Sequence, residues 1–270
     1  MKIGKDLEIE YFIADSAGNV TCFVLTLVNQ ELYQQVGKII METLEPSVEQ
    51  VAYILEDGME MSGHEFCGNA SRSYGLWMAR KEGQKGEGEV MVRVSGANQP
   101  LKVLVNTKTD YTQITMPLPM KLEKMNWEDT GFEAQITKVE LEGIHHYVCI
   151  GVPYSEEFMS LILEKAKADS MAPALGVLFF DREAMTMIPV VHVRGVDTVY
   201  IEGSCGSGTT AVAAMLAEEK DGKGGEWCYC IGQPAGEIGV TVTKKEGRVH
   251  CIEIWGPVKI QGNKKGTIYL

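Results

Sequence analysis

The sequence lacks a concentrated block of lysine and arginine. Its 25 basic residues are outnumbered by 37 acidic ones, and the formal net charge is −12. Proteins that bind nucleic acid or anionic membrane surfaces usually carry basic patches. We therefore expect no nucleic acid and no membrane as partners, and we favour a small molecule as the ligand.

Long apolar runs are also missing. No stretch approaches the ~20 apolar residues of a membrane-spanning helix. Residues 1–6 contain no apolar core of the length found in signal peptides. We expect a soluble, unexported protein and place it in the cytoplasm.

Cysteine occurs without the pattern of a disulfide framework or a zinc site. The count of seven is odd, which argues against paired disulfides and for reduced thiols. Only one residue separates Cys228 from Cys230, which is closer than a usual zinc-binding pair, and no second cluster accompanies them. We expect no metal ion.

Proline is scarce, with 9 residues, whereas 29 glycines exceed the usual share of about 7%. This composition favours many tight turns rather than disorder. The 270 residues suffice for one large domain or for two of common size, and we favour two with mixed α and β structure.

A short segment that carries one cysteine occurs twice, about half a chain apart. The copies span residues 61–72, with Cys67, and residues 200–210, with Cys205. In each copy the cysteine follows a turn-prone segment, precedes a glycine and a small polar residue, and leads into a helix-compatible sequence. Two thiols in matching contexts predict a site built between two related lobes.

The local sequence of each copy suits acid–base chemistry on an anion. A thiol at a helix start lies near the positive end of the peptide dipoles, which favours the thiolate. Free backbone N–H groups beside it can bind a carboxylate, and glycine lets that anion approach closely. The candidate donors are the N–H groups of Gly68, Asn69, Gly206 and Ser207.

The two halves share one order of predicted elements: strand, helix, strand, cysteine-bearing helix, strand, turn, strand. The helix predicted at 207–220 is apolar on nearly every side, so we expect it to lie inside, wrapped by sheet. We place the lobe boundary near residue 118. The first lobe then spans 1–118, completed by 258–270, and the second spans 119–257.

Five segments carry a resemblance to the diaminopimelate epimerase family of cofactor-independent amino-acid racemases, and within it to the histidine racemases. They span nearly the full chain in the family's order. Two Cys-Gly pairs in this spacing and context are far more specific than one. The segments are residues 16–19, 61–69, 146–148, 202–209 and 233–236.

The resemblance implies an α+β fold of two pseudo-symmetric lobes, each with strands wrapped around a central helix. It implies no cofactor, and it makes Cys67 and Cys205 the two catalytic bases on opposite faces of a substrate's α-carbon. The residues that it assigns to substrate binding are Asn19, Glu49, Gly68, Asn69, His146, Glu202, Gly206 and Ser207.

One departure from the family bears on the substrate. Relatives that act on diaminopimelate carry an arginine in the segment before the second cysteine, and residues 196–204 contain none. Glu49 and Glu202 match acidic positions of the histidine-racemizing relatives, so we favour free histidine. Diaminopimelate epimerisation and a non-catalytic amino-acid-binding protein on the same fold are the alternatives, and a homodimer is one assembly left open.

The chemistry explains why two thiols are needed. Loss of an α-proton leaves a carbanion, and pyridoxal phosphate would supply an electron sink, but no segment compels a phosphate cradle. Without that cofactor, charge flows into the carboxylate, where two helix N-termini can stabilise it. Inversion then needs an acid on the opposite face, so one thiolate and one thiol should titrate as a coupled pair with a bell-shaped pH profile.

Several residues have a structural reading beside the functional one. A cysteine is most often a buried structural residue, and we assign Cys22, Cys149 and Cys251 to the core. His146 is equally consistent with a site contact and a structural hydrogen bond. Arg72 either braces its own helix or meets the ligand.

Overall fold

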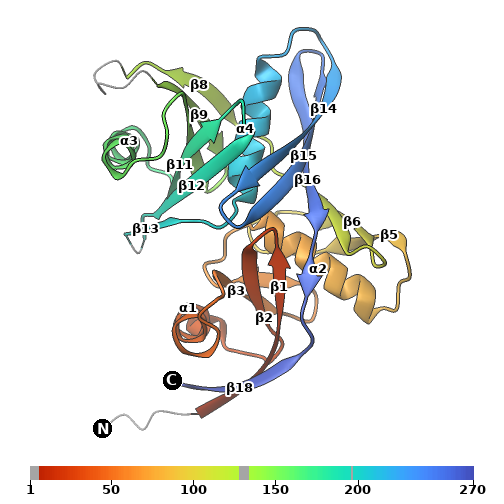
Figure 1. Cartoon of the computed structure of the whole chain (residues 1–270). Helices are drawn as coiled ribbons and strands as arrows, with labels where there is room; N and C mark the ends of the chain where they lie inside the picture. Colours follow the sequence, from red (N-terminus) through yellow and green to blue (C-terminus); the bar gives the residue numbers. More distant parts are fainter. Residues whose placement is uncertain (1–5, 128–133, 196) are drawn as a thin grey trace. The chain divides into compact units, whose positions relative to one another are not determined.

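The chain divides into two compact units. Residues Met1–Ile114 and Gly256–Leu270 form unit 1, and Thr115–Trp255 form unit 2. The computed structural model describes residues 6–127, 134–195 and 197–270 (Figure 1). Both units mix strands with a few helices, so the predicted α+β class is confirmed.

A six-stranded sheet builds one part of unit 1. Its strands follow the order β17-β1-β2-β3-β4, and β18 also pairs with β1. Ala17 and Gly18 have φ of 59° and 84°, which suits a two-residue turn of the right twist between β1 and β2. The strands are β1 (Asp6–Ser16), β2 (Asn19–Val24), β3 (Gln50–Ile54), β4 (Met59–Met61), β17 (Lys259–Ile260) and β18 (Lys264–Tyr269).

Helix α2 (Gly68–Lys81) is the central helix of unit 1. It packs against β1 and against the antiparallel strands β5 (Glu87–Val92) and β6 (Leu101–Asn106), and β6 pairs in turn with β7 (Tyr111–Thr115). Every residue from Gly68 to Leu76 is buried, although four of the nine are polar or charged. A surface helix would show a polar stripe at this spacing, so these polar residues have internal partners.

Residues 30–44 differ from the single helix that their spacing predicts. Asn29 caps a short 3-10 turn, Gln30–Leu32, through a hydrogen bond from Glu31, and α1 (Tyr33–Ile39) and a π-turn (Ile40–Leu44) follow. The expected apolar face is nonetheless buried, in a cluster shared with β1, β2, β3 and β18. The cap and the periodicity predicted the segment, but not its change of helical pitch.

The described residues of unit 2 form one run of paired strands and two helices. The strands follow the order β16-β15-β14-β12-β11-β10-β9-β8, with β13 beside β12. They are β8 (Lys121–Met125), β9 (Gln135–Leu141), β10 (Ile144–Ile150), β11 (Ala174–Asp181), β12 (Thr186–Val193), β13 (Thr198–Ile201), β14 (Gly225–Gln233), β15 (Gly236–Lys245) and β16 (Arg248–Pro257).

Helix α4 (Gly206–Glu218) is the central helix of unit 2. All its residues from Gly208 to Ala217 are buried, and it contacts β9, β10, β11, β14 and β15. Figure 1 shows these strands around it. The prediction that this apolar helix lies inside a sheet is confirmed. Helix α3 (Glu156–Asp169) is capped by Ser155, a residue type common at this position, and packs on β11.

Three short strands were not predicted. β4 has only three residues, β8 is polar along most of its length, and all four residues of β13 are exposed. β8 and β13 lack the period-2 burial on which strand prediction depends, and β4 alternates but is too short for a pattern to be recognised. Their pairing comes from neighbouring strands rather than from their own side chains.

A buried ion-pair cluster joins the end of α3 to the sheet of unit 2. Lys138 of β9 is 6% exposed, and its Nζ lies 2.9 Å from Glu140 Oε1 and 2.8 Å from Asp169 Oδ2. Burial alone would raise the pKa of Asp169, but hydrogen bonds from Lys138 and Tyr147 hold that pKa below its usual value. Lys138 likewise lowers the pKa of Glu140.

These pKa shifts give a prediction with a defined sign. Because both folded carboxyls have lowered pKa values, the cluster stabilises the fold above about pH 4, and this stabilisation is lost as the pH falls below it. We expect Lys138→Met to lower the free energy of unfolding by about 2 kcal/mol at pH 7, with a smaller difference from wild type at pH 3. Denaturant melts of both proteins at the two pH values measure this.

Lys167→Met is the matched control, because Lys167 pairs with Glu164 on the exposed surface of α3. An exposed pair contributes at most about 1 kcal/mol. Equal effects of the two substitutions would show that the cluster of Lys138 is not stabilising.

Candidate active site

Each of the two predicted thiols caps the N-terminus of a buried helix. Cys67 precedes α2 with φ −128° and ψ 110°, and Cys205 precedes α4 with φ −125° and ψ 110°. The sulfur accepts the third N–H of its helix in both cases, from Ala70 at 3.4 Å and from Gly208 at 3.2 Å. The repeated sequence therefore folds into a repeated local geometry.

A second pair of hydrogen bonds repeats behind the sulfurs. Ser71 Oγ donates to the Cys67 carbonyl at 2.7 Å, and Thr209 Oγ1 donates to the Cys205 carbonyl at 2.8 Å. These bonds fix the carbonyl side of each cap. The N–H groups of a helix's first turn have no acceptor within the helix and carry its positive dipole end, which suits them to an anion.

The first thiol site comprises Cys67 with Asn19, Glu49, Gln50 and the start of α2. Gln50 Nε2 lies 3.3 Å from the Cys67 sulfur and also donates to Asn19 Oδ1 at 2.7 Å. Asn19 Nδ2 donates in turn to Glu49 Oε2 at 3.1 Å. One chain of side chains thus connects a carboxylate to the sulfur within unit 1.

Asn69 is fixed by a different partner. It is 2% exposed, and its Oδ1 accepts a hydrogen bond from Arg72 Nε at 3.2 Å. The side chain of Asn69 is therefore fixed by Arg72 of the same helix. The backbone N–H of Asn69 belongs to the first turn of α2 and stays the predicted donor at this position.

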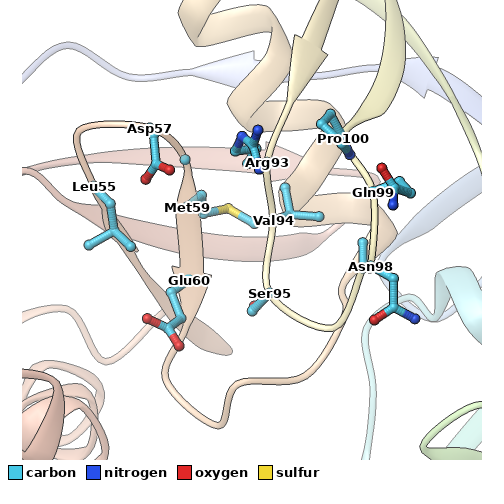
Figure 2. A pocket seen from close by; sticks show the side chains of 12 residues that line it. Leu55, Asp57, Met59, Glu60, Arg93, Val94, Ser95, Asn98, Gln99 and Pro100 are labelled. Atoms are coloured by element: carbon cyan, nitrogen blue, oxygen red, sulfur yellow. The ribbon is translucent and has the colours of Figure 1, made fainter.

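The loop between β5 and β6 supports the segment that leads into Cys67. Ser95 Oγ donates to the Glu65 carbonyl at 2.7 Å and accepts from the Met61 N–H at 2.9 Å. Ser95 also lines a hollow of about 260 Å³, shown in Figure 2 with Glu60 and Asn98. No predicted site residue lines this hollow or a larger one of about 720 Å³ beside Trp77.

The second thiol site comprises Cys205 with His146, Glu202, Gly206, Ser207 and Gln233. Ser207 Oγ lies 3.4 Å from the Cys205 sulfur and 2.9 Å from His146 Nε2. His146 is fully buried, and burial lowers its pKa to about 3, so the ring is neutral. A neutral imidazole has one N–H, on either Nδ1 or Nε2. The nitrogen that carries the proton decides whether His146 donates to Ser207 or accepts from it.

We assign that proton to Nε2. Nδ1 of His146 is buried with no hydrogen-bond partner among the described residues, and an unsatisfied buried N–H costs more than an unused lone pair. His146 Nε2–H then donates to Ser207 Oγ, and the Ser207 hydroxyl is free to donate to the Cys205 sulfur. This chain favours a negative charge on the sulfur when the thiol loses its proton.

Two other effects oppose that charge. Burial raises the pKa of Cys205 well above its usual value, and the charge of Glu202 raises it further. Hydrogen bonds from Ser207 and the Gly208 N–H lower the pKa of Cys205, but by less than burial and Glu202 raise it. Cys205 is therefore a thiol at rest.

The hairpin between β14 and β15 anchors the second thiol site from behind. Gln233 Oε1 accepts the Cys205 N–H at 2.7 Å, and its Nε2 donates to Thr209 Oγ1 at 3.0 Å. Ala235 N–H donates to the Gly203 carbonyl at 2.9 Å. In both units, then, the first hairpin after the cysteine helix braces the segment before the cysteine.

The predicted residues fall into two groups. In unit 1 the structure brings Asn19 and Glu49 to the thiol side of α2, and in unit 2 it brings His146 to the first turn of α4 through Ser207. Gln50 and Gln233 were not predicted. The sequence did repeat a Gln-Pro pair at Gln99 and Gln233, but a repeat alone does not say that the amide reaches a cap.

The other five cysteines lie outside the two thiol sites. Cys22 and Cys149 are buried in the core as expected, Cys251 is half-buried, and Cys228 and Cys230 are exposed. Within residues 6–127, 134–195 and 197–270, no group of three or more His, Cys, Asp or Glu side chains has the geometry to hold a metal ion. No helix in these ranges is long and apolar enough to cross a membrane.

Comparison with known proteins gives a family model that covers almost the whole chain. Residues 8–269 match the model described as the histidine racemase CntK N-terminal domain. A histidine racemase of Fusobacterium nucleatum subsp. nucleatum is 28% identical over 99% of this chain and 99% of its own. A histidine racemase of Staphylococcus aureus is 23% identical over 86% of this chain and 88% of its own.

Solved structures share the fold at low sequence identity. A hydroxyproline epimerase from Agrobacterium vitis aligns with a TM-score of 0.60 and 13% identity, over 99% of this chain and 93% of its own. A predicted epimerase from Pseudomonas aeruginosa aligns with a TM-score of 0.62 and 11% identity, over 95% and 98%. The predicted fold is confirmed.

The packing of His146 gives a prediction for this site. A Cβ added at Gly176 would lie 2.0 Å from His146 Nδ1, so Gly176→Ala must displace the ring from Ser207. We expect the free energy of unfolding to fall by about 1–3 kcal/mol and the pH dependence of Cys205 alkylation to change. Denaturant melts and alkylation followed by peptide mass spectrometry measure these effects.

Gly195→Ala is the control within unit 2, because an added Cβ there meets no atom within 4 Å. The proposed packing is wrong if both variants melt like wild type.

Proposed function

Since the chain belongs to the histidine racemase family and is an amino-acid racemase or epimerase, we propose that it inverts the α-carbon of free histidine without a cofactor. Cys67 and Cys205 are the proposed acid–base pair. The observation that carries the proposal is the matched placement of both sulfurs at the N-caps of buried helices.

In the proposed reaction, one proton leaves the α-carbon of the substrate and another proton is added to the same carbon. A thiolate takes the α-proton from one face, and a thiol gives a proton to the other face, so the stereocentre inverts. Each turnover exchanges the protonation states of the two sulfurs, and the reverse reaction uses them in opposite roles. The coupled pair should give a bell-shaped pH profile.

The negative charge of the carbanion passes into the substrate carboxylate. The backbone N–H groups of Gly68 and Asn69, and of Gly206 and Ser207, are the proposed donors to that group. Donors held in place before the reaction need no reorganisation when the charge develops, which is the basis of electrostatic stabilisation in acyl-transfer sites as well. Removal of one such donor typically costs about 10²–10³ in rate.

Acidic side chains support histidine as the substrate. Glu49 is exposed at the end of the Asn19–Gln50 chain, and Glu202 lies three residues before Cys205. A carboxylate pairs well with the imidazolium of histidine and poorly with the second carboxylate of diaminopimelate. The two named relatives that match this chain over most of their length are histidine racemases.

Hydrogen exchange tests the reaction and the substrate together. In D2O under reducing conditions, we expect deuterium at the α-carbon of histidine, and slower or no exchange with diaminopimelate, alanine and lysine. Cys67→Ser and Cys205→Ser should each abolish racemisation, because a serine hydroxyl is a far weaker acid than a thiol. NMR of the α-proton and chiral chromatography measure the two outcomes.

Cys228→Ser is the matched control, because Cys228 is exposed and lies outside both thiol sites. Exchange by neither histidine nor any other amino acid of the panel would contradict the proposal. Racemisation that survives in both site variants would contradict the assignment of the cysteines.

Glu49→Gln tests the recognition of the side chain. The substitution removes a charge and keeps the shape, so we expect kcat/KM for histidine to fall by about tenfold at pH 6, where imidazole is protonated. The fall should be smaller at pH 8.5, where imidazole is neutral. The ratio of wild type to variant is taken at each pH, so that titration of the thiols cancels.

Glu56→Gln serves as the control, since Glu56 is an exposed acid of the same unit outside the first thiol site. A ratio that is the same at both pH values would exclude an ion pair between Glu49 and the imidazolium.

A further inference from the structure

Arg72, in the second turn of α2, is the largest fully buried side chain of the described chain, with 0% exposure. Arginine is almost never buried without a paired charge, because removal of a guanidinium from water costs several kcal/mol. The full burial of Arg72 is therefore unusual for an arginine.

The hydrogen bonds of Arg72 are to neutral groups. Nε donates to Asn69 Oδ1 at 3.2 Å, and one terminal nitrogen donates to Thr112 Oγ1 at 3.3 Å and to the Gly256 carbonyl at 3.0 Å. The other terminal nitrogen is buried with no hydrogen-bond partner. Among the described residues, no carboxylate lies within ion-pair distance of this guanidinium.

The group that most favours the cationic form of Arg72 is the sulfur of Cys67 in its ionised form. Burial lowers the pKa of Arg72 to about 10, so the side chain is still a cation at neutral pH. The groups that oppose this shift are first Cys67, at the start of the same helix, then Tyr111 of β7 and Asp15 of β1. An ionised Cys67 thus favours the buried cation more than Tyr111 or Asp15 does.

The second thiol site has a different set of charged residues. Five residues after Cys67 comes Arg72, whereas five residues after Cys205 comes the neutral, buried Thr210. Three residues before Cys205 comes Glu202, whereas His64 takes that place before Cys67. The caps of the two sites match in geometry, and each site includes an acid, Glu49 in the first and Glu202 in the second, but the buried cation Arg72 lies on the helix of the first.

We infer that Arg72 is a positioning residue that sets the resting protonation of the pair, with Cys67 as the thiolate and Cys205 as the thiol. It acts through charge on the sulfur and through Asn69, whose side chain it fixes in the first turn of α2. The inference rests on the proposed function only for the roles of base and acid. The inferred difference in protonation between Cys67 and Cys205 concerns the protein without substrate and does not depend on that function.

Site-resolved alkylation tests this inference without any turnover. Wild-type protein is treated with iodoacetamide across pH 5–10, and the rate at each cysteine is read by peptide mass spectrometry. The pH midpoint of the rate, rather than the rate itself, reports the thiolate, because Cys67 is also more accessible than Cys205. We expect the midpoint of Cys67 to lie at lower pH than that of Cys205.

Variants of Arg72 separate charge from packing. We expect Arg72→Gln to slow the alkylation of Cys67 by about tenfold at pH 7 and to leave Cys205 unchanged. Arg72→Lys keeps the charge and should restore most of the reactivity. In the racemase assay, the acidic limb of kcat/KM should move to higher pH in Arg72→Gln and return towards wild type in Arg72→Lys.

Arg80→Gln is the matched control, because Arg80 lies on the same helix but pairs with Asp110 at the surface. The inference is overturned if Cys205 has the lower midpoint in wild type, or if a folded Arg72→Gln variant keeps the wild-type profile of Cys67. Should Arg72→Gln fail to fold, the wild-type midpoints and Arg72→Lys decide. A protein with the expected midpoints but no α-proton exchange would refute the proposed function and leave this inference intact.

Discussion

The main constraint on both units is that a sulfur atom caps a buried helix. Serine, threonine, aspartate and asparagine are the usual caps, and a thiol accepts hydrogen bonds more weakly than their oxygens do. Neither α2 nor α4 draws its stability from the cap, then, and each must be held by packing. The strands that wrap both helices, and the unbroken burial from Gly68 to Leu76 in α2, meet this requirement.

Duplication explains the matched geometry of the two caps, and the proposed chemistry depends on the residues that differ between them. Both caps have the same backbone angles within a few degrees and the same hydroxyl bond to the cysteine carbonyl. A pair of identical thiols would share one pKa and would have no preferred resting state. The charged residues differ between the copies, with Arg72 behind Cys67 and Glu202 before Cys205, and such differences push two titrations apart.

The sequence predicted the features that repeat or alternate. Two matched cysteine segments, the apolar α4 and the capped α3 all follow from local patterns, and each is present in the structure. A hydrogen bond from a single amide side chain to a residue far along the chain leaves no such pattern in the sequence. Gln50 and Gln233 reach their caps only because β3 and the β14–β15 hairpin bring them there. The strands β8 and β13 lack alternation, so only their partners reveal them.

Two of the buried polar atoms without a partner belong to side chains that bind the first turns of the cysteine helices. Arg72 has a buried nitrogen without a partner, and Nδ1 of His146 faces Gly176, where only the absence of a side chain leaves room for the ring. Each such atom costs about 1–3 kcal/mol, so neither is there for stability. Arg72 binds Asn69 in the first turn of α2, and His146 binds Ser207 in the first turn of α4. The sheets that surround both helices offset this cost, because they bury apolar residues along almost the whole of α4 and on the strands that face α2. Arg72 and His146 therefore occupy positions where the proposed mechanism, rather than stability, accounts for a polar side chain.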